Sequence, residues 1–277
     1  MKQHLFLSWL AAFLAGYLAL PPTAPAAPVT VPDKNLEAAI RAVLQEPKGG
    51  LTDENLNNVY VLEAPGKGIR DLSGLEKCKN LSLLKLPNNQ ISDLKPLKDL
   101  VNLQSLDLAG NQISDVTPLS GLTKLQYLEL SNNRVGDVTP LGGLVNLSAL
   151  YLSNNRILEI APLGNLTRLS SLYLENNHIK DISPLVKVNR LSLLDLKDNC
   201  IKDVSPLAKQ TELRMLFLER NKLTDLEPLV AMAKADAAGE KRFAPYLRLY
   251  LTGNPLADKT RSEQLAALRS AGVRIED

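Results

Sequence analysis

The chain has 277 residues, of which 22% are charged, and its net charge at pH 7 is +2. This length suits one large domain or two ordinary ones, and the balanced charge gives no support to nucleic-acid binding. Only 4% of the residues are aromatic, so leucine has to supply most of the buried core.

The N-terminal segment is typical of a secretory signal peptide. A weakly basic start precedes the apolar run LFLSWLAAFLAGYLAL at 5–20, and Ala24-Pro25-Ala26 provides an A-x-A cleavage site. The run is short for a membrane span, which needs about 20 residues. We therefore expect residues 1–26 to be removed, leaving no membrane span, with an uncleaved anchor as the alternative. The mature chain would be secreted, periplasmic or on the cell surface.

The central part of the chain is an internal repeat. Asparagine recurs every 22 residues, with leucine at −8, −5 and −3, an aliphatic residue at +2 and +5, and proline at +7. The pattern L-x-x-L-x-L-x-x-N-x-L at this period predicts leucine-rich repeats over 58–256. A degenerate copy opens the array, and a late copy around Leu251 follows an 11-residue surplus, predicted to be a helical insertion at 231–244.

The repeat predicts an α/β solenoid, a leucine-rich-repeat horseshoe with a parallel β-sheet on its concave side. Each L-x-L segment forms a short strand, and stacking the coils buries a continuous leucine core. The repeated asparagine amide can both donate and accept, so it can satisfy backbone groups buried at the turn. We expect these asparagines to form a structural ladder: Asn89, Asn111, Asn133, Asn155, Asn177, Asn199, Asn221 and Asn254.

Units such as LQSLDLAGNQISDVTPLSGLTK resemble the repeats of bacterial internalins, and VPDKNLEAAIRAVL resembles the helical cap that opens internalin arrays. The resemblance implies an N-terminal helical cap at 27–57, in which Leu36, Ile40, Val43 and Leu44 cover the first coil. A C-terminal cap is predicted at 257–277, with a helix that has Ser262 as N-cap and Gly272 as its stop. Internalins usually continue into an immunoglobulin-like domain and a cell-wall region, neither of which follows here. We therefore expect the scaffold and the protein binding of the family to carry over, whereas the resemblance gives less support to surface attachment and host-cell invasion.

The two cysteines, Cys78 and Cys200, lie six coils apart, which is roughly 30 Å at strand spacing. A disulfide requires Cα atoms within about 7 Å, so we expect both thiols to be free.

Acidic residues recur in the outer turn of each unit, and we expect them to accept hydrogen bonds from nearby backbone N–H groups. They are Asp71, Asp93, Asp115, Asp137, Glu159, Asp181, Asp203 and Asp225.

Recognition is expected at the variable strand positions, which face the concave side. Five of the eight aromatic residues that follow the predicted signal peptide fall in these columns, and acidic residues accompany them. Aromatic anchors in a charged surround are typical of binding interfaces, and the acids favour a basic partner. The structural alternative is that tyrosine and phenylalanine merely suit strands. The predicted ligand-binding residues are Tyr127, Tyr151, Tyr173, Phe217, Tyr250, Asp107, Glu129, Glu175, Asp195 and Glu219.

No grouping of nucleophile and base is visible in the repeats, and no Cys/His spacing suits zinc. We therefore predict a non-enzymatic protein with no catalytic residue, no cofactor and no metal. The expected partner is a protein or peptide, bound by a monomer. The alternatives are a carbohydrate ligand on the same face and a structural envelope protein with no specific ligand. The signal peptide disfavours an intracellular phosphatase regulator.

Overall fold

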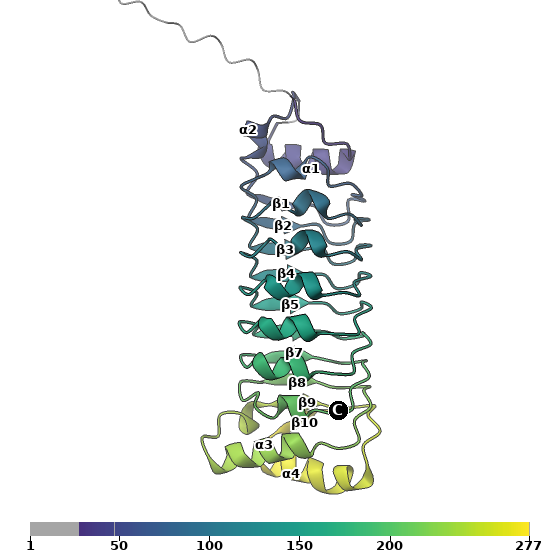
Figure 1. Cartoon of the computed structure of the whole chain (residues 1–277), viewed down its shortest axis with the longest axis vertical. Coiled ribbons are helices and arrows are strands. Elements are labelled where there is room, and N and C mark those ends of the chain that lie inside the picture. The colour runs from purple at the N-terminus through teal and green to yellow at the C-terminus, as the bar shows by residue number, and fades with distance from the viewer. Residues whose placement is uncertain (1–27, 47, 277) are drawn as a thin grey trace, which may run out of the picture.

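A computed structural model describes residues 28–46 and 48–276, so the predicted signal peptide lies outside the described residues. The described chain forms one stack of coils along the long axis, in which each coil contributes a strand (Figure 1). Ten strands form a single parallel sheet in chain order. Their bounds are β1 (Val61–Glu63), β2 (Leu83–Lys85), β3 (Ser105–Asp107), β4 (Tyr127–Glu129), β5 (Ala149–Tyr151), β6 (Ser171–Tyr173), β7 (Leu193–Asp195), β8 (Met215–Phe217), β9 (Arg248–Tyr250) and β10 (Arg274–Glu276).

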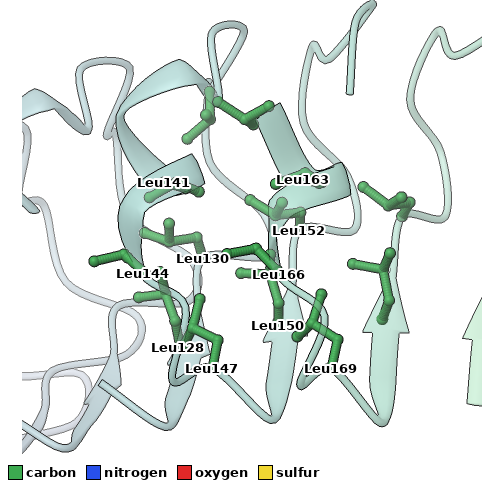
Figure 2. Close-up of a cluster of buried hydrophobic side chains, with 14 of the residues drawn as sticks. Leu128, Leu130, Leu141, Leu144, Leu147, Leu150, Leu152, Leu163, Leu166 and Leu169 are labelled. Atoms are coloured by element: carbon green, nitrogen blue, oxygen red, sulfur yellow. The ribbon is translucent and has the colours of Figure 1, made fainter. Parts of the chain in front are cut away.

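The strand register follows the repeat, so equivalent residues stand beside one another along the whole sheet. Leu150 of β5 pairs with Leu128 on one side and with Leu172 on the other. These central leucines are fully buried, while the residues flanking them on each strand lie on the opposite face. Figure 2 shows the interior, where leucines from strands and outer turns of neighbouring coils interdigitate. The predicted leucine-rich-repeat solenoid is confirmed.

Short 3-10 helices form the side of each coil that faces away from the strands. Proline stands in the first turn of six of them, where its fixed φ suits helix entry and its missing N–H is not needed. The bounds are η1 (Leu75–Lys77), η2 (Lys95–Leu97), η3 (Thr117–Leu119), η4 (Thr139–Gly143), η5 (Ala161–Asn165), η6 (Ser183–Lys187) and η7 (Ser205–Leu207).

The acidic outer-turn residues mostly act as predicted. Asp115 Oδ1 accepts from the backbone N–H of Thr117 at 2.8 Å, and Asp137 does the same for Thr139. The pKa of both carboxyls is held below its ordinary value. The largest cause is a hydrogen bond from the threonine hydroxyl, and the second is the bond from the threonine N–H. Equivalent bonds are made by Asp71, Asp93, Asp181 and Asp203. The fixed acid orients the chain as it enters each 3-10 helix.

The repeated asparagines lie in one buried row at the end of the strands. Asn155 Nδ2 donates to the carbonyls of Leu130 and Leu152, both at 3.0 Å, and its Oδ1 accepts from Val135 N–H at 2.9 Å. One amide therefore ties its own coil to the preceding one. The same pattern holds for the rest of the row, from Asn89 to Asn254.

Two helices close the N-terminal end: α1 (Lys34–Leu44), capped by Asp33, and α2 (Asp53–Leu56), capped by Thr52. Leu36 and Ile40 are fully buried against the first coil and Leu44 is partly buried. Val43 is 41% exposed, so the expectation that it covers the core is wrong. It stands on the outer side of α1, whereas Leu36 and Ile40, four residues apart, share the inner one.

The C-terminal end departs most from the predicted bounds. The helix expected at 231–244 is α3 (Glu227–Ala238), which begins at the place where earlier coils have their 3-10 helix, and a short helix η8 (Ala244–Tyr246) follows. The last helix starts as a π-helical turn, η9 (Thr260–Gln264), and continues as α4 (Leu265–Ser270). Ser262 is not its N-cap, because its hydroxyl donates to the Asp258 carbonyl inside the turn. Strand β10 lies within the predicted cap and pairs with β9.

Both cysteines are free, as predicted; Cys78 is buried and Cys200 is partly exposed. Burial, followed by the charge of Glu76, raises the pKa of Cys78 to about 12. None of the helices in the described ranges is long and apolar enough to cross a membrane.

Candidate binding face

The side chains that flank each buried strand leucine, with the residue three positions after it, form what we call the sheet face, which corresponds to the predicted concave side. All ten predicted ligand-binding residues lie on it, because strand register places equivalent positions in rows. Nine of them are partly exposed, and Asp195 is the exception, being 4% exposed. The structure therefore places the predicted residues on one face, but their side chains differ in solvent exposure.

The aromatic residues form two separate stacks. Tyr151 and Tyr173 lie with ring centroids 4.5 Å apart and nearly parallel, and Tyr127 packs on the other side of Tyr151 at 5.3 Å with a tilt of 45°. Further along the sheet, Phe217 and Tyr250 stack at 4.4 Å. Offset stacking of this kind stabilises aromatic neighbours and fixes their rings. We call the first group the tyrosine trio.

A compact ionic cluster separates the two stacks. Lys197 Nζ lies 3.4 Å from Asp195 Oδ2 and 3.3 Å from Glu175 Oε1, and it stands 5.2 Å from the centre of the Phe217 ring. Burial raises the pKa of Asp195 and outweighs the opposing effect of its hydrogen bond and ion pair with Lys197. Burial works against the charge of Lys197 too, but Asp195 and Glu175 raise its pKa overall.

This cluster corrects the role predicted for Asp195. Its side chain was expected to meet a partner, but it is enclosed by its neighbours and neutralised by Lys197. The sequence does hold a signal for this arrangement. Residues two apart on a strand point to the same side, so Asp195 and Lys197 necessarily share one face.

The acids beside the tyrosine trio accept hydrogen bonds from backbone N–H groups and, within the described residues, not from a cation. Asp107 Oδ1 accepts from the Ala109 N–H at 3.0 Å, and Glu129 Oε1 accepts from the Ser131 N–H at 2.7 Å. Neither carboxylate has a cation within ion-pair distance in the described part of the chain. Burial raises the pKa of Glu129, and nearby Asp107 adds to the rise.

The hydroxyl of Tyr127 is the most shielded of the trio. Burial raises its pKa to about 12, and the carboxylate of Glu129 is the next largest cause. The hydroxyls of Tyr151 and Tyr173 also have raised pKa values, chiefly through burial. All three phenols therefore stay protonated at neutral pH and can donate hydrogen bonds.

The far end of the face carries another acid, Glu219, and an ion pair. Glu219 has one carboxylate oxygen enclosed by the protein and without a hydrogen-bond partner in the described residues. Arg248 pairs with Glu276 at 3.2 Å, through strand β10, which the sequence did not predict. Among the predicted acids in the described residues, Asp107 and Glu129 thus form the adjacent pair without an ion-pair partner, and Glu219 stands apart from them. Over residues 28–46 and 48–276, no group of three or more His, Cys, Asp or Glu residues is placed to hold a metal ion.

Comparisons with known proteins agree with this architecture. A family model for leucine-rich repeats (2 copies) matches residues 101–143, 145–187 and 189–231. Internalin C2 from Listeria monocytogenes is 36% identical, with 73% of this chain and 90% of that chain covered and a TM-score of 0.71. No curated protein matches the sequence.

Two more distant structures share the fold. A leucine-rich-repeat protein of Leptospira interrogans is 22% identical, with 73% of this chain and 62% of that chain covered and a TM-score of 0.56. The ectodomain of the plant receptor kinase GASSHO1/SCHENGEN3 from Arabidopsis thaliana was solved in complex with CASPARIAN STRIP INTEGRITY FACTOR 2. It is 25% identical, with 77% of this chain and 25% of that chain covered and a TM-score of 0.58. Repeat, fold and the identity to internalin C2 together show that the chain belongs to the internalin-like family of bacterial leucine-rich-repeat proteins.

Proposed function

We propose that the chain is an exported, non-enzymatic binding protein that recognises a protein or peptide through the tyrosine trio of its sheet face. The observation that carries the proposal is the continuous, partly exposed row of Tyr127, Tyr151 and Tyr173. Tyrosine supplies a large contact area with few rotatable bonds, and stacking fixes the rings before any partner arrives. A preorganised aromatic row at the middle of an open sheet is well suited to anchor a partner.

The charge around the trio specifies the kind of partner. Asp107 and Glu129 are unpaired with any cation of the described chain, whereas Asp195 and Glu175 share one ion-pair partner, Lys197. A segment bearing lysine or arginine next to apolar side chains would place its cations over β3 and β4 (Figure 1). The ion-paired cluster, in which Lys197 already occupies the space between two carboxylates, and Phe217 would meet the remainder of the segment.

A carbohydrate ligand on the same face is less well supported. Sugar rings stack on exposed aromatic faces, but the faces of Tyr151 are covered by Tyr127 and Tyr173. Ring edges and phenol hydroxyls are what this row offers, and these suit polypeptide hydrogen bonds and apolar side chains. The plant ectodomain, which shares the fold, was solved in complex with a separate factor.

The test is affinity capture from the native extract with the wild type and with a Tyr151→Ala/Tyr173→Ala variant. We expect the wild type to retain a protein that the double variant loses. Tyr60→Ala is the matched control, since Tyr60 is 55% exposed but stands outside the row. Equal retention by all three proteins would contradict the proposal. A glycan retained by the wild type alone, with no protein, would favour the carbohydrate alternative.

A further inference from the structure

A second recognition surface lies along the edge of the sheet where β3 to β8 begin. An open groove of about 560 Å³ there is lined by Lys124, Arg168 and Arg190, with amide and hydroxyl side chains between them. A second groove of about 580 Å³ shares Arg190 and extends to Arg214. We call the two together the basic groove, defined by Lys124, Arg168, Arg190 and Arg214.

The repeat itself aligns these cations. Lys124, Arg168 and Arg190 each stand nine residues before the repeated asparagine of their coil, and Arg214 stands seven before Asn221. Neighbouring coils are separated by the strand spacing of about 4.8 Å, so the cations form a row parallel to the long axis. A ligand lying in this groove would cross several coils and meet a positive charge on most of them.

The positive charges are held in place without being neutralised. Lys124 Nζ donates to Asn102 Oδ1 at 2.7 Å, and Arg168 Nη1 donates to Asn146 Oδ1. Those asparagines are fixed in turn, because Asn146 Nδ2 donates to the Thr123 carbonyl at 2.8 Å and Asn102 Nδ2 makes the equivalent bond. Neutral acceptors orient a cation but leave its charge available to an anion.

The cations that define the basic groove form no ion pairs within the described residues. None of the four defining cations has an acidic partner within ion-pair distance in the ranges that the structure describes. Arg214 Nη1 instead donates to the Leu213 carbonyl at 3.1 Å. The acids appear only at the far end, where Glu212 pairs with Arg242 at 3.5 Å.

The rest of the lining indicates the chemistry of the ligand. Gln104, Gln126, Ser148 and Thr211 offer hydrogen bonds, and no aromatic or large aliphatic side chain lines either groove. A peptide would find no row of apolar anchor sites here. A single-stranded nucleic acid would meet one aromatic ring, Tyr246, which lies 5.3 Å from the Arg214 guanidinium at one end, and no succession of rings for successive bases. Hydroxyl groups and regularly spaced anions are the features that this lining complements.

We propose that the basic groove binds a linear acidic polysaccharide whose sugars carry carboxylates. Arginine guanidinium groups pair with carboxylates in a two-pronged geometry, while the amides and hydroxyls would receive the sugar hydroxyls. Arg168 and Arg190 stand on adjacent coils and Lys124 two coils before Arg168, so carboxylates spaced along an extended polysaccharide could reach them in turn while Asn146 receives a sugar hydroxyl between them. This surface is separate from the tyrosine trio, and one ligand does not require the other.

The proposal is tested by calorimetric titration with a polygalacturonate oligosaccharide long enough to reach from β4 to β8. We expect the wild type to bind it, with affinity falling as salt is raised. The variant Arg168→Gln/Arg190→Gln/Arg214→Gln should bind about tenfold more weakly or worse, because three charge-assisted contacts are removed.

The matched control is Arg134→Gln/Arg156→Gln/Lys222→Gln, which removes the same charge from exposed positions immediately after the repeated asparagines. We expect this control, and the Tyr151→Ala/Tyr173→Ala variant, to bind the oligosaccharide as the wild type does. Equal losses in the two charge variants would overturn the proposal, because attraction to the whole protein would then suffice. Absence of binding by the wild type, or equally tight and equally sensitive binding of polyglutamate, would overturn it as well.

Discussion

The asparagine row and the sheet face both run along the stack of coils, but they differ in sequence variation and in burial. The asparagine row keeps one residue type through eight coils and is buried at 3–9% exposure. The sheet face changes in residue type from coil to coil, and most of its side chains are partly exposed. Asn155 and Tyr151 lie in the same coil, four residues apart, yet one holds backbone groups of two coils and the other packs on neighbouring side chains.

The contrast teaches where sequence freedom exists in a solenoid. A buried asparagine that satisfies three backbone groups has no substitute with the same donors and acceptors. A tyrosine on the open sheet loses only stacking and surface contacts when replaced. Stability should therefore respond to one row and recognition to the other.

The largest effect is expected from Asn155→Ala, which breaks the first row. It leaves the Leu130 carbonyl and the Val135 N–H without the bonds that Asn155 gives them. Buried groups left unpaired cost about 1–3 kcal/mol of unfolding free energy, measured by urea denaturation. Asn165→Ala is the control, because Asn165 is exposed in an outer turn, and its melt should match the wild type. Equal losses in both would count against the ladder.

The next effect concerns an irregular residue inside the core. Gln210 is fully buried in the column that in the preceding coils carries cysteine, leucine or valine, and its Oε1 has no partner among the described residues. Its Nε2 bonds the Leu185 carbonyl, which also accepts from Val188 N–H. Gln210→Leu should stabilise the fold by about 1 kcal/mol, since a buried unpaired oxygen is removed. A lower denaturation midpoint would show that the polar group is required.

A smaller effect is expected for Tyr151→Ala, which breaks the second row. The ring contacts Tyr127 and Tyr173 but does not enter the leucine core, so the loss should be about 1 kcal/mol or less. Thermal unfolding followed by far-UV circular dichroism gives the measurement. A loss equal to that of Asn155→Ala would place this ring among the scaffold residues.

The smallest effect is a pH-dependent one at Glu129. Its pKa is raised in the folded state, chiefly by burial, so its protonation stabilises the fold at low pH and that contribution is lost as pH rises through the raised value. Glu129→Gln keeps the acceptor for Ser131 N–H and removes the charge. The variant should be more stable than the wild type at pH 7, by less than about 1 kcal/mol because solvent screens the carboxylate.

The comparison is made by urea denaturation at several pH values. The difference should shrink towards zero as pH falls to the ordinary glutamate pKa, near about 4.3. A difference that stays constant with pH would show that the charge of Glu129 is not responsible.

Much of this molecule follows from the period of its sequence, and the exceptions have physical reasons. The 22-residue spacing predicts the strand register and the asparagine row because every coil obeys one pattern. The repeat pattern is lost at the C-terminal end. There α3 replaces a 3-10 helix, and β10 could not be predicted because it lacks the leucine motif of the other strands. Burial of Asp195 depends on how Lys197 and Phe217 pack across coils, which single positions do not reveal.

The central claim is that the sheet face, through its tyrosine trio, meets a polypeptide partner. Its most direct test replaces Tyr151 with the photo-crosslinking residue p-benzoylphenylalanine and irradiates the full chain in native extract. The same replacement at Tyr60, which is exposed but lies outside the row, serves as the reference. The account predicts a discrete protein adduct from position 151 and none from position 60. Adducts from position 60 alone, or the same adducts from both positions, would contradict it.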